Sequence, residues 1–280
     1  MLGLSLPFAV FTARTFEALQ PHAVPRAVAV GLVALAWGGA LAHNVEGWAR
    51  PRRADAPATG AVHYAFGEYD DARRIYARLL EGSRGGLPWL ESLAAVELAG
   101  GHEARGLALA RRAVERAGDG DPLRVGRLAV ALALDGQLEA AGRTLDAAIE
   151  TEPLPELRAN RGVVSAARRE LARAREDLRS ATRDNPELFI AWHNLALVET
   201  RLGDVAAAAR ARQRAAEFAC RAPRGFPYGL GTGEIVEWGV GRRPLLLLEA
   251  GEDGADAGLL LATPPFYAAA CRTLRAAARG

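Results

Sequence analysis

The side chains best suited to catalysis or metal binding are scattered along this sequence. The five histidines stand at positions 22, 43, 63, 102 and 193, and no two of them, and no histidine with a cysteine, have the short spacing that metal ligands share. No serine lies in the Gly-x-Ser-x-Gly pattern of a nucleophile elbow. The carboxylates alternate with arginines, as is typical of ion pairs on helix surfaces. We therefore predict a non-catalytic chain without a metal or cofactor.

Three closely spaced glycines are the nearest approach to an anion-binding loop. Gly229, Gly231 and Gly233 would let backbone N–H groups come close to a phosphate. However, no predicted strand precedes them, and Glu234 follows with a charge that repels phosphate. We interpret this stretch as a loop.

The charge composition excludes several function classes. The sequence contains no lysine, which excludes a phosphate-loop lysine and a Schiff-base lysine. The formal net charge is only +2, and the arginines are interspersed with acids. Because a nucleic-acid-binding surface needs a concentrated basic patch, we expect no nucleic-acid partner.

The two cysteines, Cys220 and Cys271, are too few for a disulfide scaffold or a structural zinc site. They could pair if the domain faces an oxidising space. The composition favours the simpler interpretation, which is two unpaired and partly buried thiols.

Most of the chain repeats with a period near 34 residues. Five positions that would separate two helices, Gly67, Gly101, Gly136, Arg169 and Gly203, are spaced by 34, 35, 33 and 34 residues. Five residues after each stands a small side chain: Ala72, Gly106, Ala141, Ala174 and Ala208. Small residues let two crossing helices approach closely. This period predicts a helical repeat array.

The repeats resemble the tetratricopeptide family, whose turn pattern Gly-x-Tyr-x-x-Ala is matched by Gly67, Tyr69 and Ala72. The resemblance covers Ala56 to Ala219 and implies an all-α solenoid of about five helical hairpins. We assign residues 56–221 to the array. Two departures stand out: Arg169 replaces a turn glycine, and Thr59 with Gly60 makes a poor first helix in the first copy.

The family resemblance implies that the first helix of each hairpin lines a concave groove. By family register, the groove positions are Glu91, Ala95, Leu123, Arg127, Val130, Asn160, Val163, Ile190, His193, Asn194 and Leu197. In some family members, a lysine and an asparagine at two groove positions bind a partner's C-terminal carboxylate, and the corresponding positions of this sequence hold neither residue. An apolar groove with Arg127, Asn160 and Asn194 at its margin suits the amphipathic helix of a protein partner. Alternatively, the apolar segments Leu245–Leu248 and Leu259–Leu261 fold back and fill it.

The N-terminal residues predict membrane attachment. Residues 1–23 form an apolar, interfacial segment, residues 24–46 a transmembrane helix without charge between Ala27 and Ala42, and residues 47–55 a linker. The alternative is a buried helix of a soluble domain. One more arginine follows the predicted span than precedes it, which favours a cytoplasmic repeat domain.

The order of these parts resembles the C-terminal portion of polytopic glycosyltransferases related to protein O-mannosyltransferases. That resemblance implies repeats on the extracytoplasmic side. The membrane helices that flank the catalytic acids in that family have no counterpart here, so no catalytic residue transfers. The two arguments disagree, and the sequence leaves open on which side of the membrane the repeats lie.

The last part, residues 222–280, predicts a small C-terminal cap. It holds candidate strands at Glu234–Val240, Pro244–Glu249 and Gly258–Ala262, and a helix at Phe266–Arg279. Our hypothesis is a membrane-anchored scaffold that mediates protein interaction or complex assembly. The alternatives are the repeat portion or accessory subunit of a membrane glycosyltransferase, and a small subunit of a larger membrane complex.

Overall fold

A computed structural model describes residues 57–82, 86–221, 244–249 and 258–278. The chain divides into two compact units, Met1–Arg53 and Ala54–Gly280, and every described residue belongs to the second. The segments predicted at 1–23, 24–46 and 47–55 lie outside the described residues. Within the described ranges, no helix has both the length and the hydropathy needed to span a bilayer.

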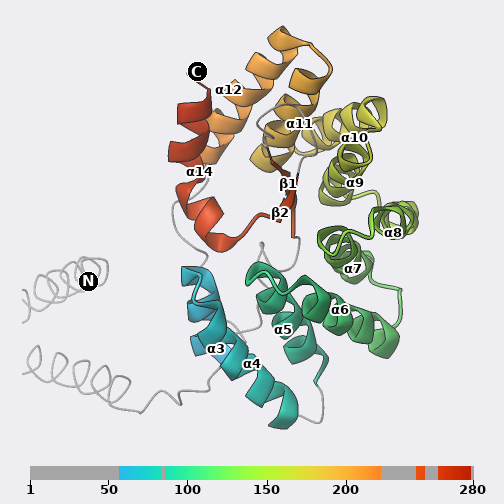
Figure 1. The fold of residues 1–280 in the computed structure, drawn as a ribbon, viewed down its shortest axis with the longest axis vertical. Coiled ribbons are helices and arrows are strands. Elements are labelled where there is room, and N and C mark those ends of the chain that lie inside the picture. Colours follow the sequence, from blue (N-terminus) through green and yellow to red (C-terminus); the bar gives the residue numbers. More distant parts are fainter. Residues whose placement is uncertain (1–56, 83–85, 222–243, 250–257, 279–280) are drawn as a thin grey trace, which may run out of the picture. The chain divides into compact units, whose positions relative to one another are not determined.

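Ten helices between residues 57 and 221 form five consecutive antiparallel pairs, and each helix also packs on the next one along the chain (Figure 1). The pairs are α3 (Pro57–Phe66) with α4 (Tyr69–Gly82), α5 (Leu87–Ala99) with α6 (Glu103–Ala117), α7 (Pro122–Leu134) with α8 (Leu138–Thr151), α9 (Pro155–Ala167) with α10 (Leu171–Asp184), and α11 (Phe189–Arg201) with α12 (Val205–Arg221). The predicted helical repeat array is therefore confirmed.

The turn inside every pair falls at the predicted anchor residue. Gly67, Gly101, Gly136, Arg169 and Gly203 all adopt a left-handed backbone, with φ angles of 79°, 74°, 79°, 64° and 78°. In the third pair, the Gln137 N–H donates to the Leu132 carbonyl at 2.8 Å and the Gly136 N–H donates to the Ala133 carbonyl at 3.1 Å. This arrangement ends a helix by satisfying its last carbonyls. Arg169 keeps the same geometry without the freedom of glycine.

The small residues predicted at the helix crossings are buried there. Ala72, Ala141 and Ala174 are fully buried, and a Cβ atom on Gly106 would lie 2.5 Å from Leu98 Cδ2. The first copy also forms its helix, although its sequence favours helix weakly. The reason is packing. A Cβ on Gly60 would lie 2.9 Å from the Tyr76 ring, so the ring fits against α3 because glycine has no side chain there.

The C-terminal cap contains two strands and a helix within the described residues. Strand β1 (Leu246–Leu248) pairs antiparallel with β2 (Leu259–Leu261), with Leu247 opposite Leu260, and α14 spans Pro264–Ala277. These elements match the second and third predicted strands and the predicted last helix. The first predicted strand, 234–240, lies outside the described residues.

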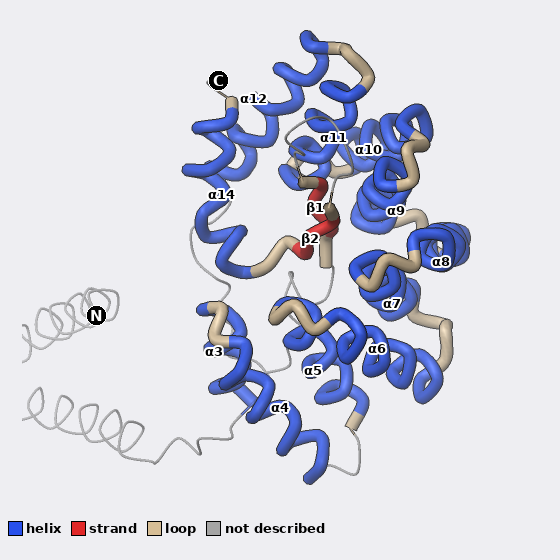
Figure 2. The backbone as a smooth tube through the Cα atoms, viewed as in Figure 1, coloured by secondary structure: helices blue, strands red, loops and turns tan. Residues whose placement is uncertain are grey.

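The cap packs against both halves of the array. Strand β1 contacts α9 and α11, and β2 contacts α7, so the strands lie inside the curve of these helices (Figure 2). Helix α14 packs along α12 and also contacts α3, so the last helix touches the first and the last helix pair. Of two tyrosines on these helices, Tyr64 on α3 is buried and Tyr267 on α14 is partly buried. Burial raises the pKa of both phenols, so both stay neutral.

A disulfide joins α12 to α14. Cys220 and Cys271 are bonded with their Cα atoms 4.5 Å apart, and the prediction of two unpaired thiols is wrong. Pairing depends on the packing of α14 along α12, a contact between residues 51 positions apart. Composition alone does not reveal such a contact.

Candidate functional site: a strand-binding groove

Two asparagines hold the main chain of β1 in the concave groove, by which we mean the face formed by α5, α7, α9 and α11. Asn160 on α9 donates from Nδ2 to the Pro244 carbonyl at 2.8 Å and accepts from the Leu246 N–H at 2.9 Å. Asn194 on α11 donates to the Leu246 carbonyl at 2.8 Å and accepts from the Leu248 N–H at 3.0 Å. Each carboxamide thus pairs with β1 as a neighbouring strand would.

This asparagine pair repeats with the period of the array. Asn160 and Asn194 are 34 residues apart and stand nine positions before their respective turn residues, Arg169 and Gly203. Their contacts on β1 shift by two residues, from Leu246 to Leu248. An extended chain advances about 3.3 Å per residue, so one repeat corresponds to about 7 Å of strand. The groove is therefore matched to the repeat of an extended backbone.

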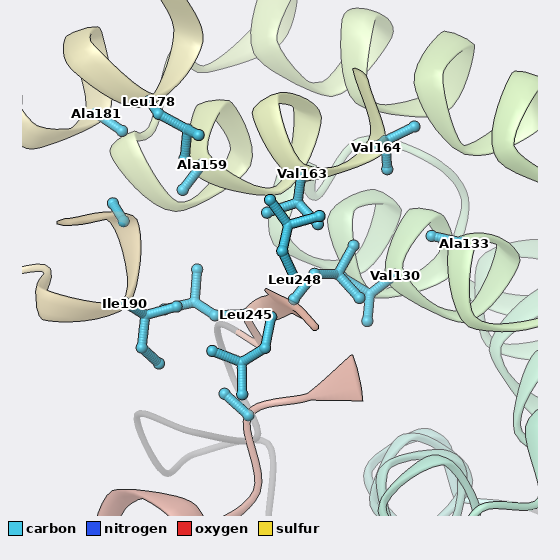
Figure 3. Packing of buried hydrophobic residues seen from close by; sticks show 14 of the residues in the cluster. Val130, Ala133, Ala159, Val163, Val164, Leu178, Ala181, Ile190, Leu245 and Leu248 are labelled. Carbon is cyan, nitrogen blue, oxygen red and sulfur yellow. The ribbon is translucent and has the colours of Figure 1, made fainter. Parts of the chain in front are cut away.

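The groove beneath β1 is apolar. Leu245, Leu246, Leu247 and Leu248 are all buried. They belong to one cluster with Val130 of α7, Val163 of α9 and Ile190 of α11, and Figure 3 shows Leu245 and Leu248 among these side chains. The asparagine pair contacts the main chain while the apolar residues enclose the leucines.

The predicted groove residues differ in their burial and in the contacts that they make. Asn160 and Asn194 are buried at the centre of the groove, not at its margin. Their carboxamides tolerate this burial because β1 satisfies them. Leu197 packs against the leucine cluster from a partly buried position, and Leu123 is also partly buried. His193 is partly buried, and loss of solvent lowers its pKa.

The N-terminal end of the groove is different. Glu91 on α5 is buried and accepts from Arg124 Nε at 2.8 Å and from Arg127 Nη2 at 2.6 Å. Arg127 stands nine residues before Gly136, where the next two copies have asparagine. Ala95 lines an apolar cavity next to this ion pair, together with Tyr64, Leu98 and Leu261. Side-chain amides therefore bond the main chain of β1 from α9 and α11, whereas α5 and α7 have an ion pair at this level of the groove.

Two site residues lay outside the sequence-based assignment. Arg124 holds Glu91, and Arg201 donates from Nη2 to the Glu249 carbonyl at 3.1 Å, which bonds the end of the β1 segment to α11. The sequence feature that could have identified the main-chain contacts is the recurrence of asparagine at one repeat position.

The groove holds a strand, whereas its apolar character favours an amphipathic helix. The difference has a physical cause. Backbone groups inside a helix are bonded to one another, so they would not satisfy the carboxamides of Asn160 and Asn194. Of the two occupants considered from the sequence, the chain's own C-terminal segment is the one present.

One group of three possible metal ligands occurs among the described residues. Ligand atoms of His63, Glu68 and Asp71 lie within 4.8 Å of one another. His63 Nδ1 is 2.5 Å from Glu68 Oε2, and Asp71 is ion-paired with Arg74. The group is partly exposed and its members are already paired, so we interpret it as ion pairing on the surface of the protein.

Comparisons with known proteins give similarity only to solved structures. No protein-family model matches the chain, and no curated protein matches it. A crystal structure of MamA is 19% identical over 58% of this chain and 95% of that one, with a TM-score of 0.46. A thermophilic TPR protein of Thermus thermophilus is 27% identical over 59% and 90%, with a TM-score of 0.49. YrrB, a TPR protein with an unusual peptide-binding site, is 18% identical over 57% and 82%, with a TM-score of 0.42. The repeat assignment therefore depends on the spacing and turn geometry of the chain itself.

Proposed function

We propose that this chain is a non-catalytic protein-interaction module whose concave groove binds polypeptide in extended form. The observation that carries this proposal is the pairing of Asn160 and Asn194 with the main chain of β1. Main-chain pairing supplies affinity without fixing the sequence, and pockets for the side chains supply selectivity. Here the side-chain requirement is apolar, since Leu245 to Leu248 are buried.

We further propose that a membrane helix at residues 24–46 tethers the module and that the repeats face an extracytoplasmic space. The disulfide between Cys220 and Cys271 supports this side, because disulfides persist in oxidising compartments and are rare in the cytosol. The balance of arginines around the predicted span favours the opposite side by a single charge. The covalent bond is the stronger argument, because a difference of one charge sets orientation weakly.

Site-specific photo-crosslinking in the native membrane tests the interaction proposal. A diazirine-bearing residue replaces Ala95, which lines the apolar cavity of the concave face, and in a matched control it replaces the exposed Arg143 on α8. We expect a discrete protein adduct from position 95 and none from position 143. Adducts from position 143 alone would contradict recognition through the groove.

A further inference from the structure

We propose that β1 is an internal ligand, and that an extended apolar segment of a partner protein replaces it in the groove. This inference depends on the proposed function and names the partner class. The partner segment has at least five extended residues, four consecutive apolar side chains, and free N–H groups at the positions equivalent to Leu246 and Leu248. Each requirement follows from a different set of contacts.

The length and backbone requirements follow from the contacts of β1. The asparagine pair bonds the Pro244 and Leu246 carbonyls and the Leu246 and Leu248 N–H groups. These atoms lie on one edge of the strand and span five residues. The other edge pairs with β2, where the Ala262 N–H donates to the Leu245 carbonyl at 2.9 Å. A foreign strand could therefore meet the asparagine pair through one edge alone.

The side-chain requirement follows from burial. Leu246 and Leu248 are 0% and 2% exposed, and Leu245 and Leu247 are 3% and 5% exposed. Both faces of the strand are therefore enclosed, so a charged side chain at any of these positions would be buried without a partner. Glu249 follows in an exposed position, which sets the end of the apolar run.

Strand β1 can be displaced because the hairpin adds little stability of its own. Each strand has three residues, and the described sheet has only these two strands. A two-stranded hairpin is marginal in water, so the groove is what keeps β1 extended. A partner strand that makes the same contacts gains the same free energy from each of them. However, it competes with a tethered strand whose effective concentration is high.

The disulfide adds a second covalent tether, beside the main chain itself, and so raises that effective concentration. Cys220 and Cys271 fasten α14, and with it the hairpin, to the last helix of the array. A dithiol reductant transfers two electrons and two protons to the disulfide, giving two thiols, and is itself oxidised to a disulfide. Both cysteines are partly exposed, so this exchange is sterically possible. Reduction therefore lowers the local concentration of β1 and favours the partner segment.

A labelled peptide with the sequence of residues 242–250, RRPLLLLEA, is the probe, and fluorescence anisotropy measures its binding to the full chain. Leu246→Asp disfavours the internal strand, and Leu260→Asp, on an exposed leucine of β2, is the matched control. We expect the peptide to bind the Leu246→Asp chain at least tenfold more tightly than the Leu260→Asp chain. Reduced wild-type chain is also expected to bind more tightly than oxidised chain.

Two further variants test main-chain recognition. N-methylation of the peptide at the residues equivalent to Leu246 and Leu248 removes the two donors that the asparagine pair uses. Since two hydrogen bonds are lost together, we expect at least about tenfold weaker binding. In the Leu246→Asp chain, replacing Asn160 and Asn194 with alanine should weaken binding similarly, while Gln213→Ala, an exposed amide on α12, should leave it unchanged.

The inference is overturned if Leu246→Asp keeps its helical circular dichroism but does not bind the peptide, or if the N-methylated peptide binds equally well. If Leu246→Asp unfolds, the reduced wild-type chain decides, and no peptide binding there overturns the inference. Crosslinks from position 95 without peptide binding would overturn the displacement of β1 and still support a protein-interaction module, with partners bound at the cavity beside Ala95.

Discussion

Asn160 and Asn194 occupy the same position in consecutive repeats, and both bond Leu246 of β1, one through its N–H and the other through its carbonyl. Two consecutive repeats thereby hold both main-chain polar groups of one strand residue. The register of β1 in the groove is set by this shared residue. A strand shifted by one residue would face the carboxamides with its other edge.

Asn194→Ala should destabilise the folded chain. It leaves the Leu246 carbonyl and the Leu248 N–H without their partners in a buried site, which costs about 1–3 kcal/mol for each unsatisfied group. Urea denaturation at neutral pH measures the free energy of unfolding. Gln213→Ala is the control and should change it by less than about 0.5 kcal/mol. An equal effect of the two variants would contradict the assignment of these hydrogen bonds.

The turn residues predict opposite effects of two substitutions. Gly136 has a φ of 79°, and an added Cβ would have no neighbour within 4 Å, so Gly136→Ala should cost about 1 kcal/mol through backbone strain alone. Arg169 has a φ of 64°, and Arg169→Gly should gain up to about 1 kcal/mol. Thermal denaturation of the two variants beside the wild type checks both signs. A stabilised Gly136→Ala variant would refute the backbone argument.

Removal of the disulfide should lower stability. The double variant Cys220→Ser and Cys271→Ser frees a loop with a sequence separation of 51 residues, which typically costs about 2–4 kcal/mol. The same loss is expected when the wild-type chain is reduced. Dithiothreitol should leave the melting temperature of the double variant unchanged, and any shift there would indicate an effect other than disulfide cleavage.

His193 predicts a pH dependence of stability. Burial lowers its folded-state pKa below the ordinary value of 6.5, so the unfolded chain binds a proton more readily. The stabilising contribution of the neutral ring is present above pH 6.5 and is lost as the pH falls through the lower folded-state pKa. Denaturation at a series of pH values on either side of 6.5 should show this loss, and His193→Gln should flatten it. An unchanged slope in the variant would assign the dependence to other groups.

The proposed membrane tether predicts the behaviour of a truncation. The full chain should stay with membranes after alkaline carbonate extraction, and a chain lacking residues 1–53 should not. Immunoblotting of the pellet and supernatant measures this partition. Release of the full chain by carbonate would contradict a transmembrane helix at residues 24–46.

The array could be predicted from the sequence because its contacts are close along the chain. Each helix packs on its neighbours, so turn residues such as Gly136 and crossing residues such as Ala141 recur at a fixed period. A weak helix in the first copy is still formed, because Tyr76 packs over Gly60. Tertiary contact there outweighs helix propensity.

The occupied groove could be predicted only in part. Leu245 to Leu248 are apolar enough to favour burial, but the choice between these residues and a partner depends on contacts such as Leu246 with Asn160, 86 residues apart. The pairing of Cys220 with Cys271 likewise depends on α14 lying along α12. The recurrence of asparagine at one repeat position indicates the groove side of the first contact, but it does not identify the strand that meets it, and the cysteine pairing has no periodic signal at all.

The contact of α14 with both α3 and α12 changes how the array should unfold. In an open repeat array, each unit is stabilised only by its neighbours, so the ends fray before the middle. Here a single helix ties the first and last pairs together, so fraying of either end would also disturb the other. The repeat domain is therefore expected to melt as one cooperative body, with similar amide-exchange protection in α3 and α12.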